Sequence, residues 1–401
     1  MVLPALTEAT SPFWRPIKYS LFPPLGLATL AGYLPGDVEV VIQDEHVETL
    51  DLDDEPDLVV IQVYITSARR AYELADHYRR CGAHVALGGL HVTSLPDEAA
   101  AHADTIFIGP GEDTWPVFLE DFRRGQPGRV YRSRSRTLAG VPPIRRDLIK
   151  RPRYLVPNSI VVSRGCPHVC DFCDKEAFFE GGKSFYTQTV DAALAEIARL
   201  PGRHLYFLDD HLFGDRRFAS ALVSGMRGMG RLWQAAGTVN AVLLPGLLEQ
   251  AVEAGLRSLF VGVETLDAAN LTEQRKYQNL RRDYASAIRR LHDLGVMVNG
   301  SFVFGMDGDD ESVWGALCRG VLAHDDLLAG ARHLAYAAGW KKFEPLWDVV
   351  IRARRAGVML PVLETILSEF GRRASPPVAA GRPAHEPVPV AAALRPANPR
   401  P

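Results

Sequence analysis

The chain has 401 residues, of which 47% are hydrophobic and 23% are charged, and its formal net charge at pH 7 is −3. This composition is ordinary for a folded globular protein and lacks the basic excess of a nucleic-acid binder. No apolar run reaches the roughly 18 residues that a membrane helix needs, and the first residues do not read as an export signal. We therefore expect a cytoplasmic protein with no transmembrane segment and no nucleic-acid partner.

Residues 1–125 alternate short apolar runs with helical patterns. The runs are continuous and rich in β-branched residues, which is typical of buried parallel strands joined by helices. This pattern predicts an α/β, doubly wound, Rossmann-like (flavodoxin-like) domain. Its first strand is poorly defined, because only residues 1–6 can form it and Pro4 interrupts them. The other strands are expected within residues 38–43, 57–64, 84–89 and 104–109, and helices within 25–34 and 68–81.

Residues 126–155 are rich in Arg, Pro and Ser and are predicted to be an irregular linker. After them the strand and helix patterns alternate again, which predicts a (βα) barrel over residues 156–325, with its site at the C-terminal ends of the strands. Residues 326–372 read as helical, and the Pro- and Ala-rich residues 373–401 as a disordered tail. Five barrel strands are expected, within residues 158–163, 204–208, 232–239, 258–263 and 296–305.

Three of the five cysteines fall within one short stretch, SRGCPHVCDFC at residues 163–173. Cys166, Cys170 and Cys173 follow the first expected barrel strand, so their sulfurs can converge at its C-terminal end. Three thiolates on a four-iron cluster leave one iron open to another ligand. The alternative is a structural zinc site, which needs a fourth ligand. In this sequence that ligand would be His168, Cys81 or Cys318.

The C-x3-C-x2-C spacing after the first barrel strand, with aromatic Phe172 before the last cysteine, resembles the signature of the radical S-adenosylmethionine (SAM) superfamily. The resemblance implies that Cys166, Cys170 and Cys173 bind a [4Fe-4S] cluster whose fourth iron is chelated by SAM. It further implies that an electron from the reduced cluster cleaves a C–S bond of SAM and releases a 5'-deoxyadenosyl radical.

Polar or small residues at three other strand ends agree with this resemblance. Asp209 and Asp210 follow the second barrel strand, where the superfamily holds the amino group of SAM. Glu264 ends the fourth strand, where polar groups meet the ribose or methionine part, and Gly305 follows the fifth, near the adenosyl group. Each has a simpler explanation: the two aspartates could cap the following helix, and Gly305 could be an ordinary turn residue.

The N-terminal domain resembles the cobalamin-binding domain that is fused to many radical SAM enzymes. The motifs that carry this resemblance are PPLGLATLAGYL, VYITSA, GGLHVTSLPDEA and GPGEDTWP. A corrinoid needs a long slot over the strand ends, lined where backbone comes close by small or hydroxylated residues. Tight turns between strands and helices are the alternative explanation for the glycines. The residues expected to line the slot are Thr66, Ser67, Gly88, Gly89, Gly109 and Gly111.

His46 stands in a stretch, DEHVET, that resembles the D-x-H-x-x-G motif in which a histidine binds cobalt. Thr49 occupies the glycine position, and the stretch follows the second strand, whereas the motif follows the first. We therefore expect no histidine ligand on cobalt and interpret His46 as a surface loop residue.

The chain departs from the family after the fifth barrel strand. No apolar β-branched run follows residue 305, so a sixth strand is predicted to be missing and the barrel incomplete. The resemblance implies a cobalamin-dependent radical SAM enzyme that either methylates an unactivated carbon or catalyses an oxidative ring closure, as the anaerobic magnesium-protoporphyrin monomethyl ester cyclase does. The alternatives are a non-catalytic paralogue that binds cofactors, and an enzyme that has lost cobalamin. We expect a small-molecule substrate and an electron donor such as flavodoxin or ferredoxin; no catalytic residue is assigned.

Overall fold

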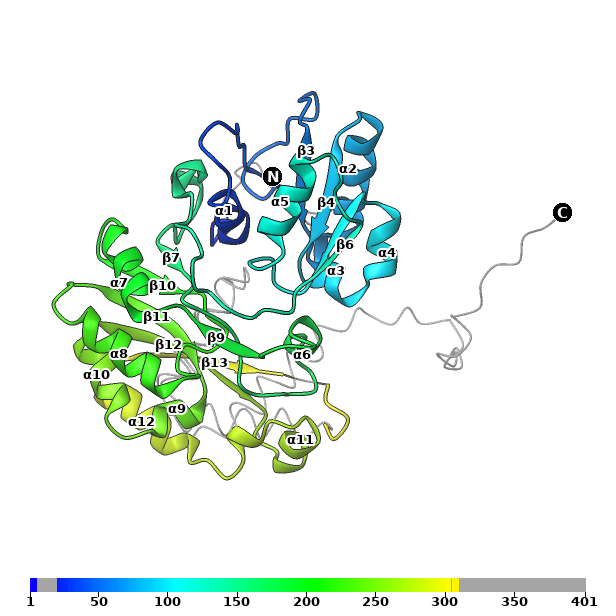
Figure 1. The fold of residues 1–401 in the computed structure, drawn as a ribbon. Helices are drawn as coiled ribbons and strands as arrows, with labels where there is room; N and C mark the ends of the chain where they lie inside the picture. The colour runs from blue at the N-terminus through cyan, green and yellow to red at the C-terminus, as the bar shows by residue number, and fades with distance from the viewer. Residues whose placement is uncertain (6–19, 304, 310–401) are drawn as a thin grey trace, which may run out of the picture. The chain divides into compact units, whose positions relative to one another are not determined.

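A computed structural model describes residues 1–5, 20–303 and 305–309 of the chain. The helical segment and tail expected after residue 325, and the place of the predicted missing strand, lie outside the described residues. Within the described ranges two parallel sheets follow one another along the chain (Figure 1). No helix in these ranges combines the length and hydropathy needed to span a membrane.

The N-terminal sheet has six parallel strands in the order β2-β1-β3-β4-β5-β6. The strands expected around residues 57–64, 84–89 and 104–109 are confirmed. The weak first strand also forms, but it is short and stops just before Pro4, whose nitrogen cannot donate to a ladder. The six strands are β1 (Val2–Leu3), β2 (Gln43–Asp44), β3 (Leu58–Gln62), β4 (His84–Gly88), β5 (Thr105–Ile108) and β6 (Val130–Arg132).

Helices cover both faces of this sheet, which is why its strands are apolar throughout rather than alternating. Val59 and Ile61 pack into the cluster with α2, α3 and α4, whereas Val60 points to the other face and packs with α1 and α5. The predicted doubly wound domain is therefore confirmed. Its helices are α1 (Leu25–Ala31), α2 (Ala68–Arg80), α3 (Leu90–Ser94), α4 (Pro96–Ala101) and α5 (Trp115–Arg123).

The segment expected to be an irregular linker contributes an edge strand. Strand β6 pairs in parallel with β5. Its central residue, Tyr131, is buried, and its hydroxyl donates a 2.7 Å hydrogen bond to Asp121. The buried side chain of Tyr131 anchors this three-residue strand. The sequence did not indicate the strand because Arg, Pro and Ser residues surround it. The rest of the segment holds two 3₁₀ turns, η3 (Arg146–Leu148) and η4 (Arg151–Arg153).

The second sheet has five strands in the order β13-β12-β11-β10-β7, and every neighbouring pair is parallel. The expected first barrel strand is interrupted: β7 ends at Ile160, and β8 pairs antiparallel with β9 in a separate ribbon. The break arises because the backbone N–H groups of Val162 and Ser163 donate to the carboxylate of Asp209. The strands are β7 (Ser159–Ile160), β8 (Ser163–Gly165), β9 (Phe185–Thr187), β10 (His204–Phe207), β11 (Leu232–Gly237), β12 (Leu256–Glu264) and β13 (Met297–Phe302).

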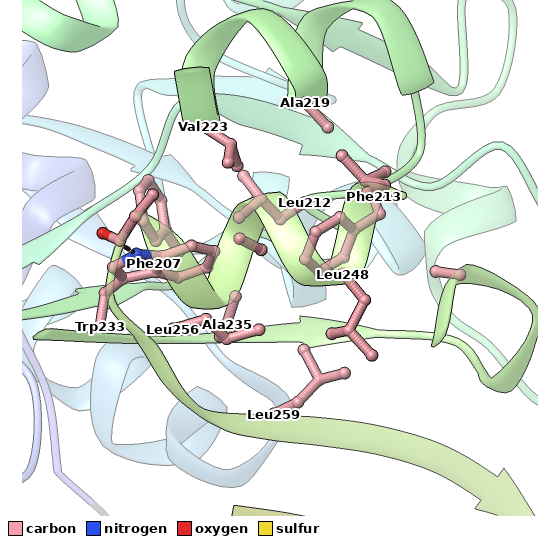
Figure 2. Close-up of a cluster of buried hydrophobic side chains, with 14 of the residues drawn as sticks. Phe207, Leu212, Phe213, Ala219, Val223, Trp233, Ala235, Leu248, Leu256 and Leu259 are labelled. Atoms are coloured by element: carbon pink, nitrogen blue, oxygen red, sulfur yellow. Dashed lines mark hydrogen bonds between the residues drawn. The ribbon is translucent and has the colours of Figure 1, made fainter. Parts of the chain in front are cut away.

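The core of this domain lies between the second sheet and the helices on one of its faces (Figure 1). At its centre the fully buried rings of Phe207 and Trp233 meet edge to face at 5.4 Å, a pair worth about 1 kcal/mol beyond its burial (Figure 2). The indole nitrogen of Trp233 donates to the carbonyl of Ala254. The helices of this domain are α6 (Lys175–Phe178), α7 (Val190–Arg199), α8 (Arg216–Met226), α9 (Val239–Leu243), α10 (Leu247–Glu253), α11 (Ala268–Glu273) and α12 (Tyr284–Asp293), and the core includes residues of α7, α8, α9, α10 and α12.

The cap of helix α8 decides whether Asp209 and Asp210 begin a helix, which the sequence left open. The Asp215 carboxylate accepts hydrogen bonds from the first backbone N–H groups of α8, so Asp215 is the cap of that helix. Asp209 and Asp210 do not cap it, and the capping explanation for them is therefore wrong. They lie earlier, just beyond the C-terminal end of β10, at the edge of the sheet where a site is expected.

Candidate functional site

The loop that carries the three cysteines begins at a residue that only glycine can occupy. Gly165 has φ +74°, and a Cβ atom there would lie 1.9 Å from the carbonyl oxygen of Ser184. The N–H of Cys166 donates to that same carbonyl. Glycine therefore lets the chain turn tightly against β9 and presents Cys166 at the strand end. Residues 166–173, which contain Cys166, Cys170 and Cys173, are called the cysteine loop below.

The three thiols of the cysteine loop lie in one electrostatic environment. Burial raises the pKa of the Cys166 thiol to about 11, and Cys170 and Cys173 act in the same direction. Burial also raises the pKa of the Cys173 thiol. In the described part of the chain no three His, Cys, Asp or Glu side chains are grouped to hold a single metal ion. A four-iron cluster takes each thiolate on a different iron, so its ligands stand farther apart than those of one ion.

A short turn after α11, residues 274–279, packs against the cysteine loop and contains the 3₁₀ turn η5 (Tyr277–Asn279). The carbonyl of Gln274 accepts from the N–H of Asp171 at 3.1 Å, and Arg275 forms an ion pair with the same aspartate at 3.3 Å. The amide nitrogen of Gln278 donates to the sulfur of Cys170 at 3.4 Å. This turn, called the 274–279 turn below, thus touches both the backbone and a thiol of the loop.

The two aspartates after β10 have different roles in the structure. Asp209 is buried, and its carboxylate accepts from the backbone of Val162 and Ser163 and from the Ser163 hydroxyl. Burial raises its pKa to about 6. Asp210 is partly exposed, accepts from the N–H of Gly165 at 3.1 Å and forms an ion pair with Lys175 at 3.2 Å. Asp210 is therefore the one of the two with a carboxylate accessible to a ligand.

Glu264 and Lys276 form a buried ion pair beside the cysteine loop. Glu264, the last residue of β12, has φ +67°, a conformation that costs a non-glycine residue about 1 kcal/mol or more. Its carboxylate lies 2.8 Å from the Nζ of Lys276, and that ammonium group is 5.6 Å from the ring centre of Phe172. Gly305 follows β13 with φ +87°, and among the described residues no atom lies within 4 Å of the place of its missing Cβ. Glu264 and Gly305 thus lie at the strand ends where the sequence placed them, and Lys276 pairs with Glu264.

Two histidines complete this group of polar residues. The rings of His168 and His211 stack at 5.7 Å between centres. Burial lowers the pKa of His211 to about 4, and His168 and Lys276 add to the effect. Among the described residues, the buried Nδ1 of His211 has no hydrogen-bond partner. Buried polar atoms are rarely left unpaired, so this atom marks a place where a polar ligand would be satisfied.

Sequence reasoning missed Lys276, Gln278 and His211. Lys276 lies 12 residues after Glu264, beyond helix α11, where no strand-end rule singles it out. Only packing of the 274–279 turn onto the cysteine loop brings it back to the site. His211 was within reach of the sequence, because it directly follows Asp209 and Asp210 at the end of β10. A histidine that directly follows two aspartates at a strand end is a pattern from which His211 could have been predicted as a site residue.

A cavity of about 820 Å³ lies over the C-terminal ends of the N-terminal strands. It is lined mostly by apolar side chains. Thr66 and Ser67, expected to belong to the slot, are not among the lining residues: they lie in the 3₁₀ turn η2 (Ile65–Ser67), where the Ser67 hydroxyl donates to the carbonyl of Tyr64. The expected residues that do line it are Gly88, Gly89, Gly109 and Gly111.

Gly89 is required by the backbone as well as by the cavity. Its φ is +112°, and a Cβ atom there would lie 2.9 Å from the carbonyl oxygen of Val63. Gly111 differs, since a Cβ atom would meet only Leu30, at an ordinary 3.5 Å. The tight-turn explanation therefore holds for Gly89, whereas Gly111 leaves room that the fold itself does not need.

The interpretation of His46 as a surface loop residue is wrong in one respect: His46 lines the same cavity. Its Nδ1 lies 2.9 Å from a carboxylate oxygen of Asp44, whose other oxygen accepts from the Tyr154 hydroxyl at 2.9 Å. The ring is held against the cavity wall because β2 ends beside β1 and delivers residue 46 to the same edge of the sheet.

Arg164 connects the cavity to the cysteine loop. It lies in β8, two residues before Cys166, and it lines the cavity together with Glu112 from the N-terminal domain. The Nε of Arg164 donates to the carboxylate of Glu112 at 2.8 Å. Burial tends to lower the pKa of Arg164, but the Glu112 carboxylate outweighs it, so the net shift is upward. The cavity and the cysteine loop are thus joined by one partly buried ion pair.

Two family models match the chain. The model of the B12 binding domain matches residues 19–119, and the model of the radical SAM superfamily matches residues 160–319. The chain thus resembles the cobalamin-binding radical SAM enzyme family in both of its domains. The first model covers the domain that holds the glycine-lined cavity, and the second covers the cysteine loop and the 274–279 turn. The cofactors of this family are cobalamin, SAM and a [4Fe-4S] cluster.

Relatives and solved structures agree with this combination of a B12 binding domain and a radical SAM domain. An uncharacterized methyltransferase of Synechocystis is 29% identical over 75% of this chain, and the bacteriochlorophyllide d C-12(1)-methyltransferase of Chlorobaculum tepidum is 28% identical over 64%. The chain spans 58% of the length of each. The structure of the radical SAM methyltransferase TsrM from Kitasatospora setae has the same fold, with 15% identity and a TM-score of 0.62 over 80% of this chain and 69% of that one.

The residues present fit the three cofactors of the family. The cysteine loop offers three thiols to a four-iron cluster, which would leave one iron open to another ligand. The unpaired Nδ1 of His211 and the accessible carboxylate of Asp210 offer partners to the polar methionine part of SAM. Gly111 leaves space at the cavity wall for a large ligand such as a corrinoid.

Proposed function

We propose that this protein is a cobalamin-dependent radical SAM methyltransferase that acts on an unactivated carbon of a small molecule. The observation that carries the proposal is the junction at Arg164, where a cavity suited to a corrinoid meets the loop that presents three cysteines. A methyl transfer by a radical route needs both cofactors at one substrate, and this junction supports such an arrangement. The names of the relatives favour methylation over oxidative cyclisation.

In this proposal Cys166, Cys170 and Cys173 are the protein ligands of the [4Fe-4S] cluster. The cluster supplies the electron that cleaves SAM reductively. The pKa of the Cys166 thiol is high in the protein as it stands, so the thiol must lose its proton when iron binds. Burial of Cys170 keeps water from the cluster. Cys81 is not placed to assist, because it is exposed at the end of α2 and contacts His77.

Binding of SAM falls to the residues at the ends of β10, β12 and β13. Asp210 accepts from the SAM ammonium group, since its carboxylate is the accessible one of the aspartate pair. Glu264 and Lys276 face the ribose or methionine part with one negative and one positive group. Gly305 would let the backbone approach the adenine, because no atom of the described residues lies within 4 Å of the place where a Cβ atom would stand. Asp209 contributes indirectly by tying β10 to the start of the cysteine loop.

Gly88, Gly109 and Gly111 would form part of the wall that holds cobalamin in the cavity of about 820 Å³. The protein's contribution is to orient the corrinoid and to keep water away, since the difficult chemistry belongs to the cofactor. An external one-electron donor such as flavodoxin or ferredoxin reduces the cluster in this proposal.

The test is anaerobic reconstitution followed by product analysis. Purified protein is supplied with iron, sulfide and hydroxocobalamin, and then with SAM and a chemical reductant. Absorbance and EPR spectra are expected to show one [4Fe-4S] cluster and one corrinoid per chain, and chromatography is expected to show 5'-deoxyadenosine and S-adenosylhomocysteine. A protein that binds iron but no corrinoid would contradict the cobalamin-dependent part of the proposal.

A further inference from the structure

Gln278 is the residue of the 274–279 turn that reaches a sulfur of the cysteine loop. Its side-chain nitrogen lies 3.4 Å from the Sγ of Cys170. Both residues are buried, with exposed fractions of 8% for Gln278 and 7% for Cys170. A thiolate can only accept a hydrogen bond, so the amide must present its N–H and not its oxygen. In such a dry setting the bond is stronger than it would be in water.

The position of Gln278 is fixed by its neighbours. The Asn279 amide donates to the carbonyls of Gly262 and Val263 in β12, which anchors the turn to the sheet. Arg282 donates to the backbone carbonyl of Gln278 at 3.1 Å. At the other end of the turn, Gln274 holds the backbone of the cysteine loop at Asp171. The backbone that carries the Gln278 amide is therefore held beside the sulfur by contacts that do not involve the sulfur itself.

We propose that Gln278 is a positioning residue that tunes the cluster, and that its N–H bond to Cys170 makes the reduction potential of the cluster less negative. The inference rests on the proposed ligation of the cluster by the three cysteines. Hydrogen bonds to the sulfurs are among the factors that set the potential of an iron–sulfur cluster. The bond stabilises the reduced state more than the oxidised one, because the reduced cluster places more negative charge on its sulfurs.

The test compares reduction potentials in protein carrying the reconstituted cluster. Gln278→Leu removes the donor at similar volume, and Gln278→Glu replaces it with a negative group. Tyr277→Phe is the matched control, because the Tyr277 side chain is 56% exposed on the outer side of the same turn. The measurement is a redox titration followed by EPR, together with iron and sulfide content. The midpoint potential is expected to become more negative in the Leu variant, more negative still in the Glu variant, and to stay unchanged in Tyr277→Phe.

The other possible outcomes contradict either the inference about Gln278 or the proposed function. If the Leu variant holds a full cluster with the same midpoint potential as the parent, the inference about Gln278 is wrong and the proposed function is unaffected. Gln278→Met is measured as well, since its unbranched side chain packs in the same space without an N–H. Loss of the cluster from both the Leu and the Met variants would show a structural role and overturn the tuning role. A parent protein that binds no cluster would overturn the proposed function, and the inference with it.

Discussion

The Nε of Arg164 donates a 2.8 Å hydrogen bond to Glu112, and this ion pair joins the N-terminal domain to the strand that leads into the cysteine loop. The exposed fractions of the two side chains are 24% and 10%, so the pair is largely shielded from water. Removing one partner leaves the other charge without compensation. We expect Glu112→Ala to lower the free energy of unfolding by about 2 kcal/mol, as for hydrogen bonds to charged groups.

Chemical denaturation of Glu112→Ala, Arg164→Ala and the double variant measures this coupling. The two single effects should add to clearly more than the effect of the double variant, because each single change breaks the same bond. Arg145 and Asp147 provide the control, since they form an equally short but exposed pair. Asp147→Ala should change stability by about 0.5 kcal/mol or less. Strictly additive effects of the Glu112 and Arg164 changes would refute the coupling.

Replacement of any one of Cys166, Cys170 and Cys173 by Ala is expected to abolish the [4Fe-4S] signal in absorbance and EPR spectra, since a cluster with two protein ligands is labile. Cys81→Ala and Cys318→Ala are the controls and should retain it. Cys81 is exposed on another domain, and Cys318 lies outside the described residues. Iron that remains bound after all three loop cysteines are replaced would rule out this assignment.

Gly111→Leu is expected to weaken cobalamin binding by about tenfold or more, a loss of ~1.4 kcal/mol. The reason is steric, because the new side chain would enter the cavity without straining the backbone. Gly89 is a poorer choice, since any side chain there also collides with Val63. Gly36→Leu is the control, because nothing surrounds that position. Titration with hydroxocobalamin followed by absorbance gives both affinities, and equal binding by the two variants would place the corrinoid elsewhere.

The sequence predicted the strands and the cysteine loop because both are encoded locally. A run such as DLVVIQVY contains the β-branched residues of a buried strand, and the spacing of three cysteines is visible without a structure. The ends of the parallel strands also meet at one edge, so position alone predicted that Asp210, Glu264 and Gly305 lie at strand ends, as they do. Asp209 also lies at a strand end, but its carboxylate accepts a hydrogen bond from the backbone N–H of Ser163 in β8.

What the sequence did not predict depends on contacts between distant segments. Lys276 and Gln278 reach the site only because a turn after α11 folds back onto the cysteine loop. His46 lines the cavity because β2 pairs with β1. A strand of two residues is too short to be predicted from the sequence. The Arg164 to Glu112 pair likewise joins residues 52 positions apart. No pattern in a single sequence specifies such pairings.

The last prediction concerns the edge of the barrel. In the part of the chain that the structure describes, β13 pairs with β12 alone, and the place where a sixth strand would follow lies outside it. If that strand is missing, one side of the SAM site is open to water, and unpaired backbone groups of β13 are left at the edge. The cluster should still bind, because its ligands lie on the first-strand loop.

We therefore expect weak SAM binding by isothermal titration and less than stoichiometric 5'-deoxyadenosine under reducing conditions. Glu264→Gln should weaken the binding further, by about tenfold or ~1.4 kcal/mol, because it removes the charged partner of Lys276 at the strand end. Glu253→Gln, an exposed change at the far end of α10, is the control and should leave binding unaltered. Tight binding with multiple turnovers by the parent protein would show that the barrel is closed well enough to work, and that a segment beyond residue 309 covers the edge of β13.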